Sequence, residues 1–383
     1  MTALEGKLVI TIEQAVAAPF CTSRLADAGA RVIKVERPEG DFARGYDKAA
    51  NGLSSYFVWL NRGKESVVLD LKNAGDRELL LRMIELADVL VQNLKPGSLD
   101  RMGLGPQALL ARNPRLVCCS ISGYGDTGPY SARKAYDLLI QADSGLCSIT
   151  GGPESAARVG ISLVDIATGA TAHAAILEAL LQRDRTGGGV DIRISMFDVI
   201  ADWLAVPFLH ARAGTPPQRI GLAHPSISPY GVFSTRDGRE VLVSIQNDRE
   251  WAIFARDVLA RPDMAADPDF STNNGRVQNR AVVDAAVAKR FAALDHDEAV
   301  RLLVETDTAF ADVNGIGDLL THPHLTQTDI DTETGPQTIP APAAVTDGKR
   351  HAGHRVPGLG ADSAAIREEF APGDPRSPGA GAD

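Results

Sequence analysis

The segment Gly160-Ile-Ser-Leu-Val-Asp165-Ile-Ala-Thr-Gly169 contains the carboxylic acid that we expect to carry chemistry, Asp165. It is followed by small and apolar residues whose spacing predicts a helix over 166–185. Free backbone N–H groups and the positive end of a helix dipole favour an ionised carboxylate at this position. Two hypotheses follow: Asp165 is a charged nucleophile, or it only caps the helix, as aspartate often does.

Single basic residues follow several predicted strands in the first part of the chain. Because the carboxyl ends of parallel strands meet at one edge of a sheet, cations there could surround one anionic ligand. The alternative for each of them is an ordinary solvated side chain. These residues are Arg37, Arg44, Lys64, Lys72, Lys95, Arg101 and Lys134.

Two other motifs only superficially match known sites. Gly123-Tyr-Gly-Asp-Thr-Gly128 fits the dinucleotide pattern Gly-x-Gly-x-x-Gly, but the Pro-containing stretch 129–134 separates it from any helix that could hold a pyrophosphate. The pairs His322-Pro-His324 and His351-Ala-Gly-His354 lack helical spacing and neighbouring cysteines, which favours exposed loop histidines over a metal site. We therefore predict neither nicotinamide nor metal binding.

The composition is typical of a globular enzyme. The chain has 383 residues, 44% of them hydrophobic and 23% charged, which suggests about two domains. A net charge of −10 argues against a nucleic-acid partner. No obvious bilayer-spanning run or leader is expected, so we predict a cytoplasmic protein without a membrane partner. The four cysteines show no Cys-x-x-Cys spacing, which favours reduced thiols.

Strands alternate with helices in the first half of the chain. This order predicts an α/β fold in which helices cover both faces of a parallel sheet. The expected elements are a strand over 7–12, a helix over 21–28, strands over 31–36 and 66–71, a helix over 75–87, strands over 88–93 and 116–122, a helix over 138–147 and a strand over 190–195.

The second half has a different pattern. A Pro-rich linker at 213–217 precedes a predicted hairpin, with strands at 231–233 and 241–245. Helical patterns follow at 250–259 and 280–304, so this part predicts a small α+β domain.

An ordered series of motifs resembles one known family, the class III coenzyme A transferases or CaiB/BaiF family, over nearly the whole chain. A single one of these motifs would be weak evidence, whereas their order is specific. The motifs are Ala18-Pro-Phe-Cys-Thr22, Arg31-Val-Ile-Lys-Val-Glu-Arg-Pro38, Gly40-Asp-Phe-Ala-Arg44, Asn61-Arg-Gly-Lys64 with Leu69-Asp-Leu-Lys72, Asn93-Leu-Lys-Pro-Gly97 with Leu99-Asp-Arg-Met-Gly103, Gly123-Tyr-Gly125, Tyr136-Asp137 with Gln141-Ala142, Asp165 with Gly169, and Ser195-Met-Phe-Asp198.

The resemblance implies a domain plan. A Rossmann-like large domain with a parallel sheet spans 1–205, and a C-terminal return over 328–370 completes it. The small domain with its linkers spans 206–327, and a mobile tail follows over 371–383. Two chains are expected to interlock as a homodimer.

The resemblance also implies roles for individual residues, with Asp165 as the nucleophile and coenzyme A as co-substrate. Val16 stands where several transferases have a glutamine, so that Gln14 or Glu13 could take its role. Candidate substrate contacts are Gln14, Arg44, Arg62 and His224. The residues expected to line the coenzyme A site are Val16, Arg37, Leu69, Lys72, Asn93, Leu94, Arg101, Lys134 and Tyr136.

The expected activity is transfer of coenzyme A from an acyl-CoA, such as succinyl-CoA, to a short carboxylic acid through an aspartyl-CoA intermediate. The resemblance favours dicarboxylic acids such as itaconate, mesaconate or malate. The alternative is a 2-methylacyl-CoA racemase or another acyl-CoA isomerase. Racemases of this family have a histidine where this chain has Tyr136. Tyrosines ordinarily ionise near pH 10 and are poor bases at neutral pH, which favours transfer.

Overall fold

The structure, a computed structural model, describes residues 2–372, and these divide into two compact units. The predicted tail lies outside the described residues from 373 onward. The segment 147–158, expected in the large domain, groups with the second unit. The first unit comprises the residues up to Leu146, Val159–Val206 and the residues from Thr326, and the second comprises Cys147–Arg158 and Pro207–Leu325.

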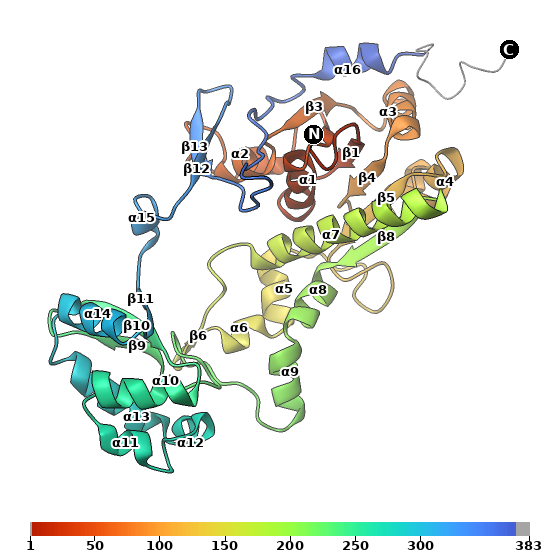
Figure 1. The fold of residues 1–383 in the computed structure, drawn as a ribbon. Helices are drawn as coiled ribbons and strands as arrows, with labels where there is room; N and C mark the ends of the chain where they lie inside the picture. Colours follow the sequence, from red (N-terminus) through yellow and green to blue (C-terminus); the bar gives the residue numbers. More distant parts are fainter. Residues whose placement is uncertain (1, 373–383) are drawn as a thin grey trace. The chain divides into compact units, whose positions relative to one another are not determined.

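A six-stranded sheet forms the centre of the first unit (Figure 1). Each neighbouring pair is parallel, which confirms the predicted sheet. The order β3-β2-β1-β4-β5-β8 reverses its direction between β1 and β4, and ligands of such sheets bind at this point. The strands are β1 (Leu8–Ile12), β2 (Arg31–Glu36), β3 (Lys64–Val68), β4 (Val89–Gln92), β5 (Val117–Ser122) and β8 (Val190–Ser195).

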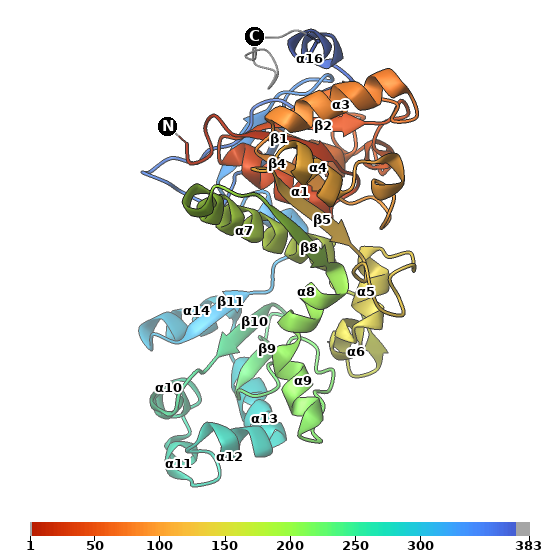
Figure 2. The same cartoon turned by 90° about the vertical axis from the view of Figure 1, so that its right-hand side faces the viewer.

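Helices cover both faces of this sheet (Figure 2). On one face lie α1 (Ala17–Asp27) and α7 (Leu163–Thr186), and on the other lie α3 (Ala74–Leu86), α4 (Pro106–Arg112) and α16 (Ser363–Glu369). Each face of the sheet packs against its helices in an apolar core. Successive side chains of a strand point to opposite faces, so one strand can contribute to both cores. Since α16 belongs to the C-terminal segment, that segment completes the first unit.

The helix α7 differs from expectation in two respects. It begins at Leu163, before the predicted start at 166. It is also long and apolar enough, by length and composition, to span a bilayer, so the expectation that the chain has no such run was wrong. Residues such as Ala172 and Ile176 are fully buried against α1 and the sheet, as in the core helix of a globular unit.

Shorter elements complete the first unit, and α6 and α9 lie where the two units join in sequence. The predicted helix over 138–147 is two shorter helices, α5 and α6. These elements are η1 (Phe42–Gly45), α2 (Ser55–Leu60), η2 (Asp100–Met102), α5 (Asp137–Asp143), α6 (Leu146–Ile149), α8 (Met196–Trp203), α9 (Ala205–Arg212), β12 (Gln327–Ile330) and β13 (Gln337–Pro340).

The second unit has an antiparallel sheet in the order β11-β10-β9, and its β9–β10 hairpin was predicted. Helices pack on it around Trp251, Phe254 and Phe291. The predicted helix over 280–304 is interrupted after Phe291. Its elements are β6 (Gly151–Gly152), β7 (Ser155–Ala156), β9 (Tyr230–Ser234), β10 (Glu240–Ser244), α10 (Asp248–Ile253), η3 (Phe254–Val258), α11 (Pro262–Ala266), α12 (Asn273–Gln278), α13 (Arg280–Phe291), α14 (His296–Glu305), β11 (Ala309–Asp312) and α15 (Ile316–Leu319).

Candidate active site

Asp165 lies in the first turn of α7, and its side chain is partly buried. Within residues 2–372, no group donates a hydrogen bond to its carboxylate. A carboxylate that has lost part of its hydration without gaining hydrogen bonds is a more reactive nucleophile than a solvated one. This position therefore suits attack on a substrate carbonyl.

The residue that caps α7 is Asp137, the first residue of α5. Its Oδ1 accepts the backbone N–H groups of Val164 at 2.7 Å and Asp165 at 3.2 Å. Its Oδ2 accepts a hydrogen bond from Gln141 Nε2 at 2.7 Å. Gln141 Oε1 in turn accepts the N–H of Val159 at 2.9 Å. The hypothesis that Asp165 itself is the helix cap is therefore wrong.

The electrostatic environment of Asp165 also differs from expectation. Burial, and after it the negative charge of Asp137, raise the pKa of Asp165 to about 7. The helix terminus was expected to favour the ionised form. Burial and the like charge of Asp137, however, both oppose ionisation, and the Asp137 carboxylate occupies the N–H groups of Val164 and Asp165 at the start of the helix.

Tyr46 lies within electrostatic reach of this carboxylate, and of Tyr56 and Tyr136. Tyr46 packs edge-on against Tyr56, with ring centroids 5.5 Å apart. Burial, with contributions from the charges of Asp41 and Asp165, raises the pKa of Tyr46 to about 12. Tyr46 therefore remains a neutral phenol that can donate a hydrogen bond. Tyr136 precedes α5, and its side chain is 60% exposed, so it is accessible to a ligand.

A cavity of about 280 Å³ lies at the start of α7, where Ser162 and Ile166, on either side of Asp165 in sequence, contribute to its wall. Aromatic and small side chains form its wall, and none of the lining residues is a cation. Such a wall suits the acyl part of a small substrate. The lining residues are Ser55, Tyr56, Trp59, Gly160, Ile161, Ser162 and Ile166.

The loop between β1 and α1 is held from two sides. Asn93 Oδ1 accepts the N–H of Gln14 at 2.9 Å, and Asn93 Nδ2 donates to the Gln14 carbonyl at 2.8 Å. The next residue, Ala15, has a φ of 64°, and its N–H donates to Asp41 Oδ1 at 3.1 Å. A non-glycine residue keeps this conformation only where its surroundings impose it. The loop is therefore preorganised.

A buried ionic cluster underlies this loop. Glu13 Oε1 lies 2.6 Å from Lys64 Nζ and 3.4 Å from Lys34 Nζ, and Lys34 Nζ also lies 2.9 Å from Asp41 Oδ2. Although burial opposes ionisation, the charges of Lys64 and Lys34 lower the pKa of Glu13 to about 2. Gln14 and Glu13 were the two candidates for the role of the family's glutamine. Because Glu13 is bound in this ionic cluster, only the Gln14 side chain is available to a ligand.

A second cavity, of about 260 Å³, lies at the carboxyl ends of β1 to β4, at the switch point of the sheet. Four of the residues expected to line the coenzyme A site contribute to it, namely Arg37, Leu69, Lys72 and Leu94. Gln14 lines it as well. The cavity therefore combines two cations and an apolar wall with four carboxylates, those of Glu13, Glu36, Asp41 and Asp70.

The other residues expected at the coenzyme A site do not line this cavity and have different roles. Val16 is buried at the start of α1, and Asn93 holds the β1–α1 loop. Arg101 Nη2 donates to Ser98 Oγ at 3.2 Å. Lys134 is exposed in the loop between β5 and α5. Arg101 and Lys134 therefore remain accessible cations.

Comparison with known proteins identifies the family. The family model described as CoA-transferase family III matches residues 4–363. The chain belongs to this family. The transferase is 37% identical to the acetyl-CoA:oxalate CoA-transferase of Acetobacter aceti, covering 96% of this chain and 95% of the relative. It is 33% identical to the succinyl-CoA:mesaconate CoA-transferase of Haloarcula hispanica, covering 96% of each.

A solved structure shares the fold of the transferase. The crystal structure of a CaiB/BaiF family protein from Brucella suis matches with a TM-score of 0.81 and 34% identity, covering 96% of this chain and 99% of that one. The family and the enzyme class predicted from the motif series are thus confirmed.

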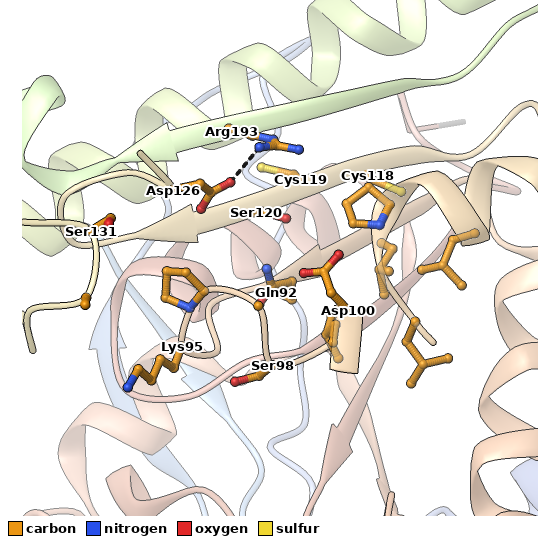
Figure 3. A pocket seen from close by; sticks show the side chains of 18 residues that line it. Gln92, Lys95, Ser98, Asp100, Cys118, Cys119, Ser120, Asp126, Ser131 and Arg193 are labelled. Carbon is orange, nitrogen blue, oxygen red and sulfur yellow. Dashed lines mark ion pairs between the residues drawn. The ribbon is translucent and has the colours of Figure 1, made fainter. Parts of the chain in front are cut away.

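A further cavity of the transferase, of about 430 Å³, lies elsewhere (Figure 3). It is bounded by β4, β5 and β8 and by the loop Lys95 to Asp100, and it shares no lining residue with the cavity at the switch point. Arg193 in its wall pairs with Asp126 at 2.9 Å, as Figure 3 shows. This cation is therefore neutralised.

Two candidate substrate contacts are committed to structural ion pairs. Arg44 donates to both oxygens of Glu36, at 2.9 and 2.7 Å. Arg62 is 2% exposed and pairs with Asp27. The structure therefore does not favour either as a substrate contact. Their acidic partners are remote in sequence or on another element, so the basic residues alone could not reveal these pairings.

The remaining predicted motifs are placed as follows. His224 belongs to the second unit, stacks on Tyr230 with ring centroids 5.4 Å apart, and accepts the N–H of Ser226 at 3.1 Å. No helix starts within the glycines after β5, since the next helix begins at Asp137, as the sequence predicted. Among residues 2–372, no group of three or more His, Cys, Asp or Glu side chains is placed to bind a metal ion.

Sequence reasoning assigned no role to Tyr46, Tyr56 or Asp137. The pair Asp137 and Gln141 carried the available signal, because residues four apart lie on the same side of a helix. That spacing shows that the two side chains meet. It does not show that they meet at the start of α7.

Proposed function

We propose that this transferase moves coenzyme A from succinyl-CoA to a short dicarboxylic acid, with Asp165 as the covalent nucleophile. The observation that carries the proposal is the Asp165 carboxylate, which lies in the first turn of α7 beside a small cavity and receives no hydrogen bond from residues 2–372. A carboxylate held in this way is available for bond formation, because no structural role occupies it.

The first half-reaction has two steps. A carboxylate oxygen of Asp165 attacks the thioester carbonyl carbon, the C–S bond breaks, and coenzyme A leaves as a thiolate. The thiolate then attacks the aspartyl carbonyl of the mixed anhydride, the anhydride C–O bond breaks, and the donor acid leaves as a carboxylate. The product is an aspartyl-CoA thioester. An acceptor carboxylate repeats both steps in reverse order and restores Asp165.

The neighbouring phenols suit the charge that develops in these steps. Each attack places negative charge on a carbonyl oxygen, and a preorganised donor lowers the barrier most where water is excluded. Tyr46 stays protonated through the physiological range, because its pKa is raised to about 12 by burial and nearby negative charge. We assign Tyr46 as such a donor, together with the Gln14 side chain.

The cavity at the switch point is the proposed binding site for the nucleotide part of coenzyme A. Arg37 and Lys72 supply positive charge for phosphates, while Leu69 and Leu94 supply an apolar wall for the base. The accessible Arg101 extends this positive charge.

The substrate class rests on the relatives. Two of them are named for oxalate and mesaconate, both dicarboxylates. In this chain, Tyr56 and Ser162 line the cavity beside Asp165, and Arg44 and Arg62 are engaged elsewhere. We therefore infer that hydroxyl groups, rather than a guanidinium of the first unit, contact the acid in that cavity.

We also propose that the chain forms a homodimer. Closely spaced side chains of the α8–α9 segment are apolar and more than half exposed, namely Trp203, Val206, Phe208 and Leu209. Exposed apolar side chains clustered in this way usually mark an interaction surface. Size-exclusion chromatography with light scattering should give the mass of two chains, and a monomer at micromolar concentration would contradict the proposal.

The test of the catalytic proposal combines activity with trapping. The wild-type enzyme is incubated with succinyl-CoA and a panel of oxalate, mesaconate, itaconate, malate and acetate, and the CoA thioesters formed are resolved by mass. In the absence of acceptor, the mass of the intact protein should increase by that of coenzyme A less water. Asp165→Asn should abolish both signals. Transfer at a substantial rate by this variant would refute the proposal, and transfer to acetate alone would refute the dicarboxylate assignment.

A further inference from the structure

The start of α7 is organised by Asp137 rather than by the reactive residue. Asp137 is 8% exposed and Gln141 is fully buried, so the three hydrogen bonds that the Asp137 carboxylate accepts are shielded from water. Through them, α5, the segment before α7 and the first turn of α7 form one hydrogen-bonded unit. An uncharged side chain could accept the same two N–H groups. Capping the helix therefore does not by itself require a carboxylate at this position.

We propose that Asp137 is a positioning residue for Asp165: it holds the backbone of Asp165 by hydrogen bonds and places a fixed negative charge against the reactive carboxylate. This inference rests on the function proposed above. The hydrogen bond to the Asp165 N–H fixes the position of the backbone that carries the nucleophile. A displacement of about 1 Å of such a group can lower the rate about 100-fold.

The charge of Asp137 has a separate effect. Ionised Asp165 is repelled by it, whereas the mixed anhydride and the aspartyl-CoA thioester carry no charge at this residue. Forming either intermediate therefore relieves the repulsion, so that Asp137 destabilises the resting carboxylate relative to the acylated enzyme. The raised pKa of Asp165 is consistent with this repulsion, which acts in addition to burial.

The other groups around Asp165 do not supply a comparable charge. Tyr46 at the end of η1, Tyr56 of α2 and Tyr136 before α5 contribute phenol groups. Helix α1 packs close to α7 through Phe20. Within residues 2–372, Asp137 is the charged residue that acts on the protonation of Asp165.

Three variants separate hydrogen bonding from charge. Asp137→Ala removes both. Asp137→Asn keeps an acceptor oxygen for the two N–H groups and removes the charge, but its amide faces the Gln141 amide donor. The double variant Asp137→Asn with Gln141→Glu restores that contact, because the carboxylate introduced at position 141 accepts from the amide introduced at position 137 and from the Val159 N–H. It keeps one negative charge in the network.

The matched control is Asp143→Asn, at the exposed end of the same helix, where Asp143 accepts a hydrogen bond from the Tyr124 hydroxyl. It removes the same charge from α5 far from the α7 cap. Its kcat and pH profile should equal those of the wild type. Thermal melting and circular dichroism of all variants check folding.

The measurements are kcat, KM for acyl-CoA, and the pH midpoint at which kcat/KM rises. Asp137→Ala should lose about 100-fold in kcat with KM changed by less than about threefold. Asp137→Asn should move the midpoint down by about one pH unit, as removal of a neighbouring like charge does. The double variant should return the midpoint towards that of the wild type. A purely structural cap would lower stability without moving the midpoint.

The outcomes distinguish this inference from the function it rests on. If the wild type transfers coenzyme A and Asp165→Asn does not, the proposed function stands. An unchanged midpoint in Asp137→Asn then overturns the positioning role, even if Asp137→Ala fails to fold. If Asp165→Asn transfers coenzyme A as fast as the wild type, the proposed function falls, and the inference falls with it.

Discussion

Replacing Asp165 by asparagine should make the free enzyme more stable at alkaline pH. The folded state holds the Asp165 proton up to a pKa of about 7, whereas an aspartate in the unfolded chain releases it near its ordinary value of 3.8. Between these two values the folded state binds more protons, so the stability of the wild type falls as the pH rises through this window. Asparagine carries no charge and removes this dependence.

The structure sets the size of the effect. A rise in pKa from 3.8 to about 7 corresponds to about 4 kcal/mol of unfavourable free energy once Asp165 is fully ionised, at about 1.4 kcal/mol for each tenfold change in proton affinity. The penalty is complete above about pH 7 and absent below about pH 4. Asp165→Asn should therefore gain up to about 4 kcal/mol at pH 8 and almost nothing near pH 4.

The assay is denaturant unfolding of the wild type and of Asp165→Asn at several values between about pH 4 and 8, without substrates. Asp143→Asn is the control, because substitution of an exposed aspartate usually changes stability by less than about 0.5 kcal/mol. The difference between Asp165→Asn and the wild type should grow steadily with pH. Equal stability at pH 8, or a loss, would refute the assignment of Asp165 as a destabilised, functional carboxylate.

Three further predictions concern the scaffold. Gly169→Ala should lower the free energy of unfolding by about 1–3 kcal/mol and slow transfer, because a Cβ at this position would lie 2.5 Å from the Ala17 carbonyl oxygen. Unaltered unfolding and kinetics would contradict this close approach of α7 to α1. Glu13→Gln should lower the free energy of unfolding, measured with denaturant, by about 3–5 kcal/mol, because it leaves the buried Lys64 charge without its carboxylate. A loss of stability below about 1 kcal/mol would mean that the ionic cluster is dispensable. Lys72→Ala should raise KM for acyl-CoA about tenfold with kcat unchanged, and an unchanged KM would remove Lys72 from the nucleotide site.

The strands of the sheet were predictable because each is a short segment that contains Val or Ile and lies between turn signals. The expected strand over 31–36 coincides with β2, and that over 190–195 with β8. Helix starts were less predictable. Helix α1 begins at Ala17 rather than at 21, with Pro19 in its first turn, where a proline's missing N–H removes no helical bond.

The buried charges show a different limit. Lys34 and Lys64 are fully buried on neighbouring strands, and their counter-charges, Glu13 and Asp41, lie on other segments. A lysine's exposure depends on whether such a partner reaches it, and that depends on how strands and loops meet in space. The same holds for Arg62, whose partner Asp27 lies on α1.

The sequence by itself determined the parallel α/β plan, the family and the residue on which the chemistry is proposed, because these follow from local periodicity and from motifs in a specific order. The tertiary structure decided how Asp165 is held and charged. It placed Asp137, 28 residues earlier, at the start of α7, and it removed water from around Asp165. Desolvation and like-charge proximity depend on distances between segments that are remote in sequence, so no local pattern could predict the pKa of the nucleophile.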